Sequence, residues 1–285
     1  MKRIPPLIIV FAVCFLVGYL GSTLVTGKDR NTGIIANLLR DSRKKNILLI
    51  GVDARHPREP SRSDTIMVAF CNPQAKRVDL LSVPRDTRVL IAGDERHRKI
   101  NHAMAEGGPQ LLRTTVEELL NTKVDGWIAI DFQGFAQVID TLGGITIDVE
   151  ERMYYPPEGI DLRPGIQRLN GKDALAYVRY RSDGLGDIGR IERQQKFMHA
   201  LAKEMLSARG LLKSPALLGE IQGQVDTNLS KDELLGLVKA YIDFDNVTLN
   251  THTLPGEPHM IGGGSYWIAD RQKTRILLNT IQQAK

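Results

Sequence analysis

Short apolar runs separated by polar turns recur along most of the chain. Each run is rich in β-branched residues and bounded by turn-forming residues, which is typical of a β-strand. The pattern predicts strands at NILLIGV (46–52), TIMVAFC (65–71), VDLLSV (78–83), WIAI (127–130), ITIDV (145–149), AYVRY (176–180) and VTLNTHTL (247–254).

Between these runs the apolar residues follow a helical period. In PQLLRTTVEELLN (109–121), Leu112, Val116 and Leu119 recur at helical spacing behind a proline suited to a first turn. Three further helices are predicted at residues 191–208, 231–242 and 270–282. Strands that alternate with helices indicate an α/β sandwich. No internal repeat or long linker interrupts residues 46–285, so we predict one domain there.

A short turn, NPQAKR, joins the second and third predicted strands. Such a short connection makes the two strands antiparallel, and the sheet is therefore mixed. If the turn centres between Gln74 and Ala75, facing residues have numbers that sum to about 149. Asp64 then lies opposite Arg85.

The longest apolar stretch lies near the N-terminus. Residues 5–27 carry no charge and are long enough to cross a bilayer as one helix. A cleaved signal peptide is the alternative, although its apolar core is normally shorter. We expect a retained anchor, with a tail at residues 1–4 and a juxtamembrane stalk at 28–45. Lys and Arg residues flank the span on both sides, so charge alone does not determine the orientation.

Composition narrows the choice of partners only slightly. The net charge of +5 is compatible with an anionic partner. Cys14 and Cys71 both lie in apolar runs, so no disulfide is predicted. The cysteines and histidines form no zinc-binding motif.

Charged residues stand at the ends of the predicted strands. Asp53 follows the first strand, Asp64 precedes the second, Arg85 follows the third, and Arg179 and Arg181 end a later one. Ligands of α/β sheets collect outside strand ends, so these residues are candidates for one site. Two carboxylates beside a phosphate ligand suit Mg²⁺. The alternative is that each aspartate caps a loop or forms a surface ion pair.

The stretch RYRSDGLGDIGRIERQQ (179–195) concentrates positive charge. Its arginines are Arg179, Arg181, Arg190 and Arg193. The predicted strand places the first two on one face, and the following helix places the last two on one face with Gln194. Cations are unfavourable in the first turns of a helix, whereas an anion binds well there. The arrangement predicts phosphate binding, and neutralisation by Glu192 and Asp187 is the alternative.

Seven sequence motifs follow one another between residue 46 and about residue 200. They are LLIGVDAR, RSDTIM, LSVPRDT, KINHA, DTLGGITIDV, LNGKDALAYVRYR and GDIGRIERQQ. In this order they resemble the LytR–CpsA–Psr family of bacterial cell-envelope enzymes. The resemblance implies a three-layer α/β/α domain outside the cell, held by a single-pass anchor in the cytoplasmic membrane. It also implies transfer of a glycopolymer, such as teichoic acid or capsule, from a polyprenyl-pyrophosphate carrier onto peptidoglycan.

The resemblance also implies roles for individual residues. Asp53 and Asp64 match metal-binding positions for Mg²⁺, and Asp64, Arg85 and Arg179 are expected to be catalytic. The positions expected around the pyrophosphate are Arg85, Arg179, Arg181, Arg190 and Gln194. Arg62 and Lys99 lie within matched motifs without an assigned role.

Phosphoryl transfer would proceed by attack of a sugar hydroxyl on the phosphorus nearer the glycan, with polyprenyl phosphate leaving. Mg²⁺ and the arginines would stabilise the developing charge. The proton acceptor stays open among Asp53, Asp64 and Asp86. A hydrolase would use water with the same residues. A membrane-bound transcriptional regulator is the remaining alternative, but the sequence contains no helix-turn-helix pattern, so we expect no nucleic-acid partner.

Overall fold

The structure of the protein is a computed structural model that describes residues 44–53, 62–181, 186–207, 224–230, 233, 237 and 248–283. For Asp53 and Arg62 the backbone is described and the side chains are not. The described residues belong to two compact units. We call them the sheet unit (Arg43–Asp131, Asp226–Leu229 and Asn250–Lys285) and the helical unit (Phe132–Val225 and Ser230–Leu249).

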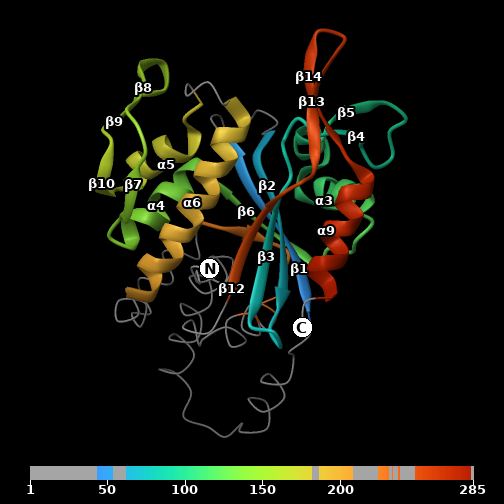
Figure 1. Ribbon diagram of the computed structural model, residues 1–285, viewed down its shortest axis with the longest axis horizontal. Coiled ribbons are helices and arrows are strands. Elements are labelled where there is room, and N and C mark those ends of the chain that lie inside the picture. The colour runs from blue at the N-terminus through green and yellow to red at the C-terminus, as the bar shows by residue number, and fades with distance from the viewer. Residues whose placement is uncertain are drawn as a thin grey trace, which may run out of the picture. The chain divides into compact units, whose positions relative to one another are not determined.

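The core of the sheet unit is a mixed six-stranded sheet with strand order β11-β6-β1-β2-β3-β12 (Figure 1). Its strands are β1 (Lys45–Asp53), β2 (Arg62–Asn72), β3 (Arg77–Ser82), β6 (Gly126–Asp131), β11 (Asp226–Thr227) and β12 (Thr248–Thr253). β1 runs parallel to β6 and antiparallel to β2, and β2 runs antiparallel to β3. The predicted mixed sheet is therefore confirmed.

Two helices of the sheet unit, α3 (Asn101–Leu120) and α9 (Arg271–Gln283), pack on one face of this sheet (Figure 1). Leu48 and Ile50 of β1 contribute to the same apolar cluster as Leu112 of α3 and Leu278 of α9. The alternate residue Ile47 is also fully buried on the opposite face of β1. Burial on both faces explains why this strand is a continuous apolar run and does not alternate with polar residues.

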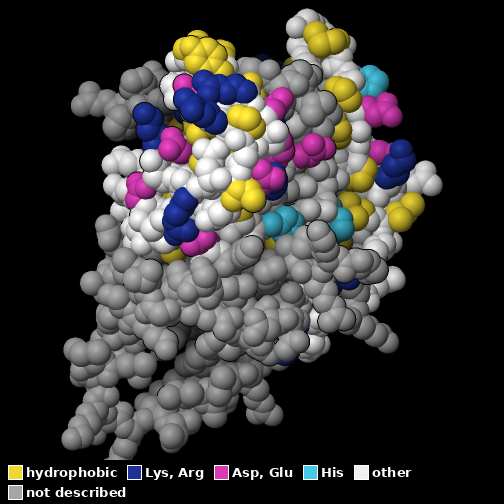
Figure 2. Space-filling view, turned by 60° about the vertical axis from the view of Figure 1, so that its left-hand side comes forward, with side chains coloured by type: hydrophobic (Ala, Val, Ile, Leu, Met, Phe, Trp, Pro, Cys, Tyr) yellow, Lys and Arg dark blue, Asp and Glu magenta, His cyan; other side chains and the backbone are white. Residues whose placement is uncertain are grey.

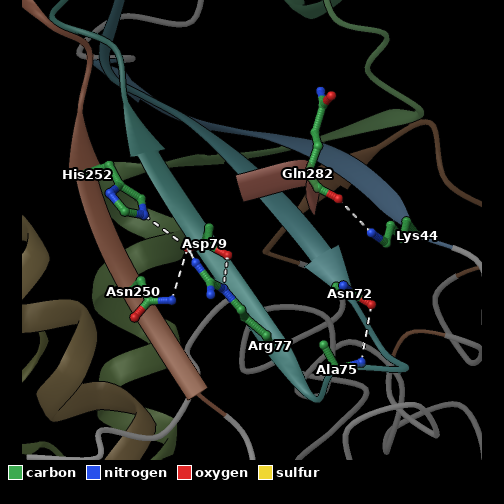
Figure 3. Close-up of polar contacts among 8 residues, drawn as sticks. All are labelled: Lys44, Asn72, Ala75, Arg77, Asp79, Asn250, His252 and Gln282. Atoms are coloured by element: carbon green, nitrogen blue, oxygen red, sulfur yellow. Dashed lines mark hydrogen bonds and ion pairs between the residues drawn. The ribbon is translucent and has the colours of Figure 1, made fainter. Parts of the chain in front are cut away.

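The turn between β2 and β3 sets the register of both strands. The Asn72 side chain accepts a hydrogen bond from the backbone N–H of Ala75 at 3.2 Å (Figure 3). Cys71 then pairs with Val78, and Met67 pairs with Ser82. This is the predicted register, so the hairpin prediction is confirmed.

The predicted helix at 109–121 is present, but α3 begins earlier, at Asn101. Asn101 does not cap it, because the N-cap residue is Ile100 and no side-chain capping bond forms. Gly107 and Gly108 have non-helical backbone angles, and they kink the helix immediately before Pro109. Pro109 cannot donate a backbone hydrogen bond, which favours a break in the helix at this point. The helical spacing of apolar residues therefore begins only after the kink.

In the part of the helical unit that the structure describes, three helices pack with two short strands. Its main elements are α4 (Phe132–Thr141), β7 (Ile145–Val149), β10 (Gly165–Leu169), α5 (Gly171–Arg179) and α6 (Gly186–Ser207). A smaller ladder joins β8 (Met153–Tyr155) to β9 (Ile160–Leu162) through the 3-10 turn η1 (Pro156–Glu158).

A buried tyrosine holds α5 and α6 to the end of β7. The hydroxyl of Tyr177, on α5, donates to the Glu150 carboxylate at 3.0 Å, and Lys196 of α6 lies 2.6 Å from the same carboxylate. Burial alone would raise the pKa of Glu150, but Lys196, its backbone amide and Tyr177 lower it below its usual value. Glu150 therefore remains a carboxylate and accepts both bonds.

The strand predicted at residues 176–180 is wrong, because these residues lie at the end of helix α5. The Asn170 side chain caps this helix by accepting from the backbone N–H of Asp173. The N-cap bond and the buried face made by Ala174 and Tyr177 favour a helix over the local β-propensity of the valine and tyrosines. Arg179 and Arg181 consequently do not share a strand face.

No helix within the described ranges is long and apolar enough to cross a membrane. The predicted anchor at residues 5–27, and most of the predicted helix at 231–242, lie outside the described residues.

A buried carboxylate joins β12 to the sheet. Asp79 of β3 is 2% exposed and accepts hydrogen bonds from Arg77, Asn250 and His252 (Figure 3). Burial alone would raise the pKa of Asp79, but the hydrogen bonds from these three side chains lower it below its usual value. The folded state therefore binds the proton of Asp79 more weakly than the unfolded chain does.

We expect Asp79→Asn to lower the free energy of unfolding at pH 7 by about 2 kcal/mol, since hydrogen bonds to a buried charged group are lost. The stabilisation by Asp79 is complete above its unfolded pKa of about 3.9 and is lost as the pH falls through the folded pKa. Urea unfolding of parent and variant should therefore converge at low pH. Asp161→Asn, which removes an exposed ion pair with Arg152, is the matched control and should change stability by less than about 1 kcal/mol.

Candidate functional site

Asp64 occupies an irregular position in the pairing of β1 with β2. Gly51 pairs with Thr65 and Val52 pairs with Ser63, so Asp64 is an extra residue on β2. A Cβ atom on residue 51 would lie 3.0 Å from the Cβ of Thr65, and glycine is the residue that permits this approach. Bulges of this kind redirect a side chain and are common beside active sites. Gly51 in the sequence LLIGVD thus helps to position the Asp64 carboxylate on the neighbouring strand.

The turn after β3 holds Arg85 and Asp86 in a fixed conformation. The backbone N–H of Thr87 donates to the carbonyl of Pro84 at 2.9 Å, and the Thr87 hydroxyl bonds the same carbonyl. The first residues of α3 close the turn from the other side, because the N–H of Asn101 donates to the carbonyl of Arg85 at 3.3 Å. Proline and these backbone bonds pre-organise the turn before any ligand binds.

Four charged side chains form a continuous row on the sheet unit, which we call the charged row: Asp64, Arg85, Asp86 and Lys99. Arg85 Nη1 lies 2.5 Å from Asp64 Oδ1, and its Nε lies 3.9 Å from Asp86 Oδ2. Lys99, at the end of β5 (His97–Lys99), reaches Asp86 Oδ1 at 2.8 Å. All four side chains are between 20% and 28% exposed, so their charges are partly shielded from water and interact more strongly than surface ions.

The backbone places two aspartates at one end of the sheet, and aspartates are ligands of divalent cations that also bind phosphate. Asp53 ends β1 and pairs through its backbone with Arg62, at the same end of the sheet as Asp64. Across the described residues, no cluster of three or more His, Cys, Asp or Glu side chains could hold a metal ion. Mg²⁺ commonly uses one or two carboxylates and takes its other ligands from water and phosphate oxygens.

On the helical unit, Arg179 is held by two neighbours that the sequence did not indicate. It is the last residue of α5, and its guanidinium lies 4.6 Å from the ring centroid of Phe132. Its Nη2 lies 2.9 Å from the Glu158 carboxylate, on the turn between β8 and β9. Glu158 therefore forms an ion pair with Arg179, whose guanidinium the sequence assigns to an anionic ligand. No sequence spacing links it to Arg179.

The predicted charged face of α6 is buried. Arg190 is 3% exposed, Arg193 is 6% exposed and Gln194 is 9% exposed, and Phe197 continues the same face. Their shared face was predicted correctly, and these arginines do not extend into water.

Part of this burial is explained by the C-terminus of α5. Arg193 donates to the carbonyl of Tyr180 and lies 5.4 Å from the Tyr180 ring centroid. Gln194 Nε2 lies 3.5 Å from the carbonyl of Val178. The last carbonyls of a helix carry partial negative charge and favour a cation there. Arg193 thus stabilises the end of α5, and it positions the segment that carries Arg179.

The predicted site residues therefore fall into two groups. Asp64 and Arg85 are in direct contact on the sheet unit, and Arg179, Arg190 and Gln194 lie at α5 and α6 of the helical unit. Arg181 is exposed just after α5. From the sequence, Lys99 had no assigned role and Asp86 was one candidate proton acceptor. In the structure Asp86 lies next to Arg85, and Lys99 forms an ion pair with Asp86.

Comparison with known proteins assigns the chain to a family. The LytR_cpsA_psr family profile matches residues 23–283. The chain belongs to the LytR–CpsA–Psr family. It is 33% identical over 266 residues to the polyisoprenyl-teichoic acid–peptidoglycan teichoic acid transferase TagV of Bacillus subtilis, covering 89% of this chain and 68% of that protein. It is 40% identical over 193 residues to the regulatory protein MsrR of Staphylococcus aureus, covering 67% of this chain and 58% of that protein.

Solved structures of the LytR–CpsA–Psr family share the fold. The crystal structure of B. subtilis TagV matches with a TM-score of 0.75 and 32% identity, covering 86% of this chain and 98% of that one. The structure of YwtF (TagT) with bound octaprenyl pyrophosphate lipid matches with a TM-score of 0.65 and 26% identity, covering 85% of this chain and 90% of that one. The mixed α/β fold is therefore that of the family.

The Arg179–Glu158 pair predicts that removing the carboxylate strengthens anion binding. An anion that binds Arg179 has to displace Glu158, so Glu158→Gln should bind inorganic pyrophosphate about threefold more tightly or better, since a competing charge is lost. Isothermal titration calorimetry would measure this. Arg179→Ala is the matched control and should weaken binding. Equal or weaker binding by Glu158→Gln would show that Glu158 does not compete for the site.

Proposed function

We propose that the protein is a Mg²⁺-dependent transferase that moves a glycopolymer from a polyprenyl-pyrophosphate carrier onto peptidoglycan. The observation that carries the proposal is the contact between Asp64 and Arg85 at the bulge, in a chain whose relatives include a teichoic acid transferase. A carboxylate and a guanidinium held together at the end of a sheet suit a metal–phosphate ligand. A solved relative, YwtF (TagT), contains a bound octaprenyl pyrophosphate lipid.

The residues of the chain would bind the donor lipid through its phosphate oxygens. The residues proposed for this role are Arg85, Arg179, Arg181, Arg190 and Gln194. Guanidinium groups match phosphate geometry and keep their charge at any physiological pH. Lys99 and Asp86 would hold Arg85 in position through the charged row.

In the proposed reaction a sugar hydroxyl of peptidoglycan attacks the phosphorus nearer the glycan. A new phosphodiester bond forms, the bond to the bridging oxygen breaks, and polyprenyl phosphate leaves with the electron pair. The arginines stabilise negative charge on the transferring and leaving oxygens, and positioning of the two substrates contributes much of the remaining acceleration. Asp86 lies within the charged row and is one candidate to accept the hydroxyl proton, together with Asp53 and Asp64.

The carboxylates fit a bound Mg²⁺. Asp64 and Asp53 would hold it, and when bound the ion neutralises charge on phosphate oxygens. Asp64 already lies against a cation, because its Oδ1 is 2.5 Å from Arg85 Nη1.

The alternative reactions differ in acceptor or in ligand. A hydrolase would use the same residues and transfer the phosphoryl group to water. A transcriptional regulator would need a nucleic-acid surface, whereas Figure 2 shows Lys and Arg side chains interspersed with Asp and Glu on the described part of the face it presents. Nucleic-acid binding normally uses a continuous basic patch.

The proposal includes the location of the protein. Residues 5–27 would be a single transmembrane anchor, and residues 46–285 a three-layer α/β/α domain on the outer face of the cytoplasmic membrane. The lipid carrier and peptidoglycan are both accessible there. The same placement makes contact with DNA impossible.

The decisive test is transfer by Asp64→Asn. Asn keeps the size and the turn-forming ability of Asp, so the variant should fold with a melting temperature near that of the parent. It lacks one carboxylate charge, so Mg²⁺-dependent transfer should fall roughly tenfold or more, which corresponds to ~1.4 kcal/mol of transition-state stabilisation. The assay uses lipid-linked glycopolymer with and without peptidoglycan, and product analysis separates transfer from hydrolysis.

Asp173→Asn is a suitable control, because Asp173 lies in the first turn of α5 and not in the charged row. It should keep parental transfer. Parental transfer by a folded Asp64→Asn protein, with unchanged dependence on Mg²⁺, would exclude Asp64 from the reaction. If the parent protein releases free glycopolymer in the presence of peptidoglycan, the protein is a hydrolase and the proposed transferase function is wrong.

The proposed topology predicts the outcome of protease treatment. Protease added to intact spheroplasts should digest residues 46–285, because the domain is outside the membrane. A cytoplasmic protein in the same cells should stay intact as the control. Protection of the domain until the spheroplasts are lysed would contradict the external location.

A further inference from the structure

A two-stranded hairpin projects from the sheet unit (Figure 1). It consists of β13 (Gly256–Ile261) and β14 (Gly264–Ala269), joined through Gly262 and Gly263. Both turn glycines have positive φ angles, which glycine adopts without strain. The sequence pattern did not predict this hairpin, and no residue of it has a role in the proposed reaction.

The base of the hairpin is bonded to the turn that carries Arg85. The backbone N–H of Trp267 donates to the carbonyl of Asp86 at 3.0 Å, and Trp267 forms a parallel β-bridge with Thr87. The Trp267 indole N–H also donates to the carbonyl of Leu254 at 3.2 Å. Trp267 and Ala269 pack against the apolar core of the sheet unit. The hairpin is therefore fixed in position at its base and exposed towards its tip.

The register separates the two faces of the hairpin. Tyr266 pairs with His259, Ile268 with Glu257, and Gly264 with Ile261, so these residues share a face opposite to Trp267. On this face Tyr266 is partly exposed, and Glu257, His259 and Ile261 are exposed. We call it the outer face. The Lys99 ammonium lies 5.5 Å from the centre of the Tyr266 ring, so the outer face continues directly into the charged row.

We propose that the outer face of the β13–β14 hairpin binds the acceptor glycan. The inference rests on the proposed function, since the acceptor has to place a hydroxyl at the phosphorus held by Arg85. From the Tyr266 ring the row passes through Lys99 and Asp86 to Arg85, with successive separations of 5.5, 2.8 and 3.9 Å. Consecutive side-chain contacts therefore join the outer face to the arginine that is proposed to bind the phosphate.

The chemistry of this face suits a polysaccharide. An aromatic ring offers a flat apolar surface on which the C–H face of a sugar ring packs, and Tyr adds a hydroxyl that forms hydrogen bonds. His259 and Glu257 supply further hydrogen-bonding groups for sugar hydroxyl and amide groups. An extended hairpin also matches an extended, linear glycan strand.

Two other occupants fit less well. Residues 256–269 contain no Lys or Arg, which a surface that binds anionic lipid headgroups would need. The exposed large apolar residues of the hairpin are Met260 and Ile261 at the tip, and these are too few to form a stable interface with a second copy of the chain.

The test measures binding of soluble, uncrosslinked peptidoglycan strands to the parent and to hairpin variants. Tyr266→Ala should weaken binding about tenfold and raise the KM for the acceptor, with little change in kcat or in the KM for the donor lipid. Tyr266→Phe keeps the ring and should bind within about threefold of the parent. His259→Ala changes an exposed residue on the same face, so it should fold normally and weaken binding by a smaller factor.

Tyr154→Ala is the matched control, because Tyr154 is an exposed tyrosine of the helical unit. It should bind peptidoglycan strands like the parent. If Tyr266→Ala and His259→Ala both bind like the parent, the hairpin is not the acceptor site, whatever the activity of the protein. If the parent binds the strands through Tyr266 but neither transfers nor hydrolyses the lipid-linked polymer, the binding site stands and the proposed function fails.

Discussion

The register of β2 against its two neighbours is the constraint on which the sheet unit depends. On one side, the short turn held by Asn72 fixes the pairing with β3. On the other side, the bulge beside Gly51 adds one residue to β2, and this residue is Asp64. A slip of one residue in either ladder would reverse the faces of every side chain. The contact between Asp64 and Arg85 exists only in this register.

A second constraint is the cost of burying positive charge in the helical unit. Guanidinium groups almost never leave water without a partner, because desolvation of the ion is expensive. Arg193 meets this requirement with a carbonyl at the C-terminus of α5, and Arg179 meets it with Glu158 and the face of Phe132. The arginines of the family motif therefore serve the fold as well as the proposed chemistry. Replacing one of them tests both roles, so substitutions at Glu158 and Asp64 are more informative.

The turn from Pro84 to Thr87 connects several functions of the sheet unit. Its Arg85 and Asp86 side chains belong to the charged row, its backbone receives the N-terminus of α3, and its Asp86 carbonyl anchors the β13–β14 hairpin. A rigid turn of this kind keeps Arg85, which is proposed to bind phosphate, and the proposed acceptor-binding face at a fixed separation. Positioning of two substrates is what phosphoryl transfer needs most from a protein.

The sequence by itself determined the features that depend on neighbours along the chain. These include the strands β1 to β3, their antiparallel hairpin and register, helix α9, the shared face of Arg190, Arg193 and Gln194, and the family. Tertiary structure decided what depends on distant partners. Residues 176–179 are helical because of a cap and a buried face, and Arg179 contacts Glu158 from another element. The Tyr266 ring approaches Lys99, and the adjacent Trp267 bonds the carbonyl of Asp86. The spacing of apolar residues and the turn-forming residues in a sequence predict helices, strands and hairpins. A contact between remote residues depends on how whole elements pack, and the spacing of residues in one sequence does not show this packing.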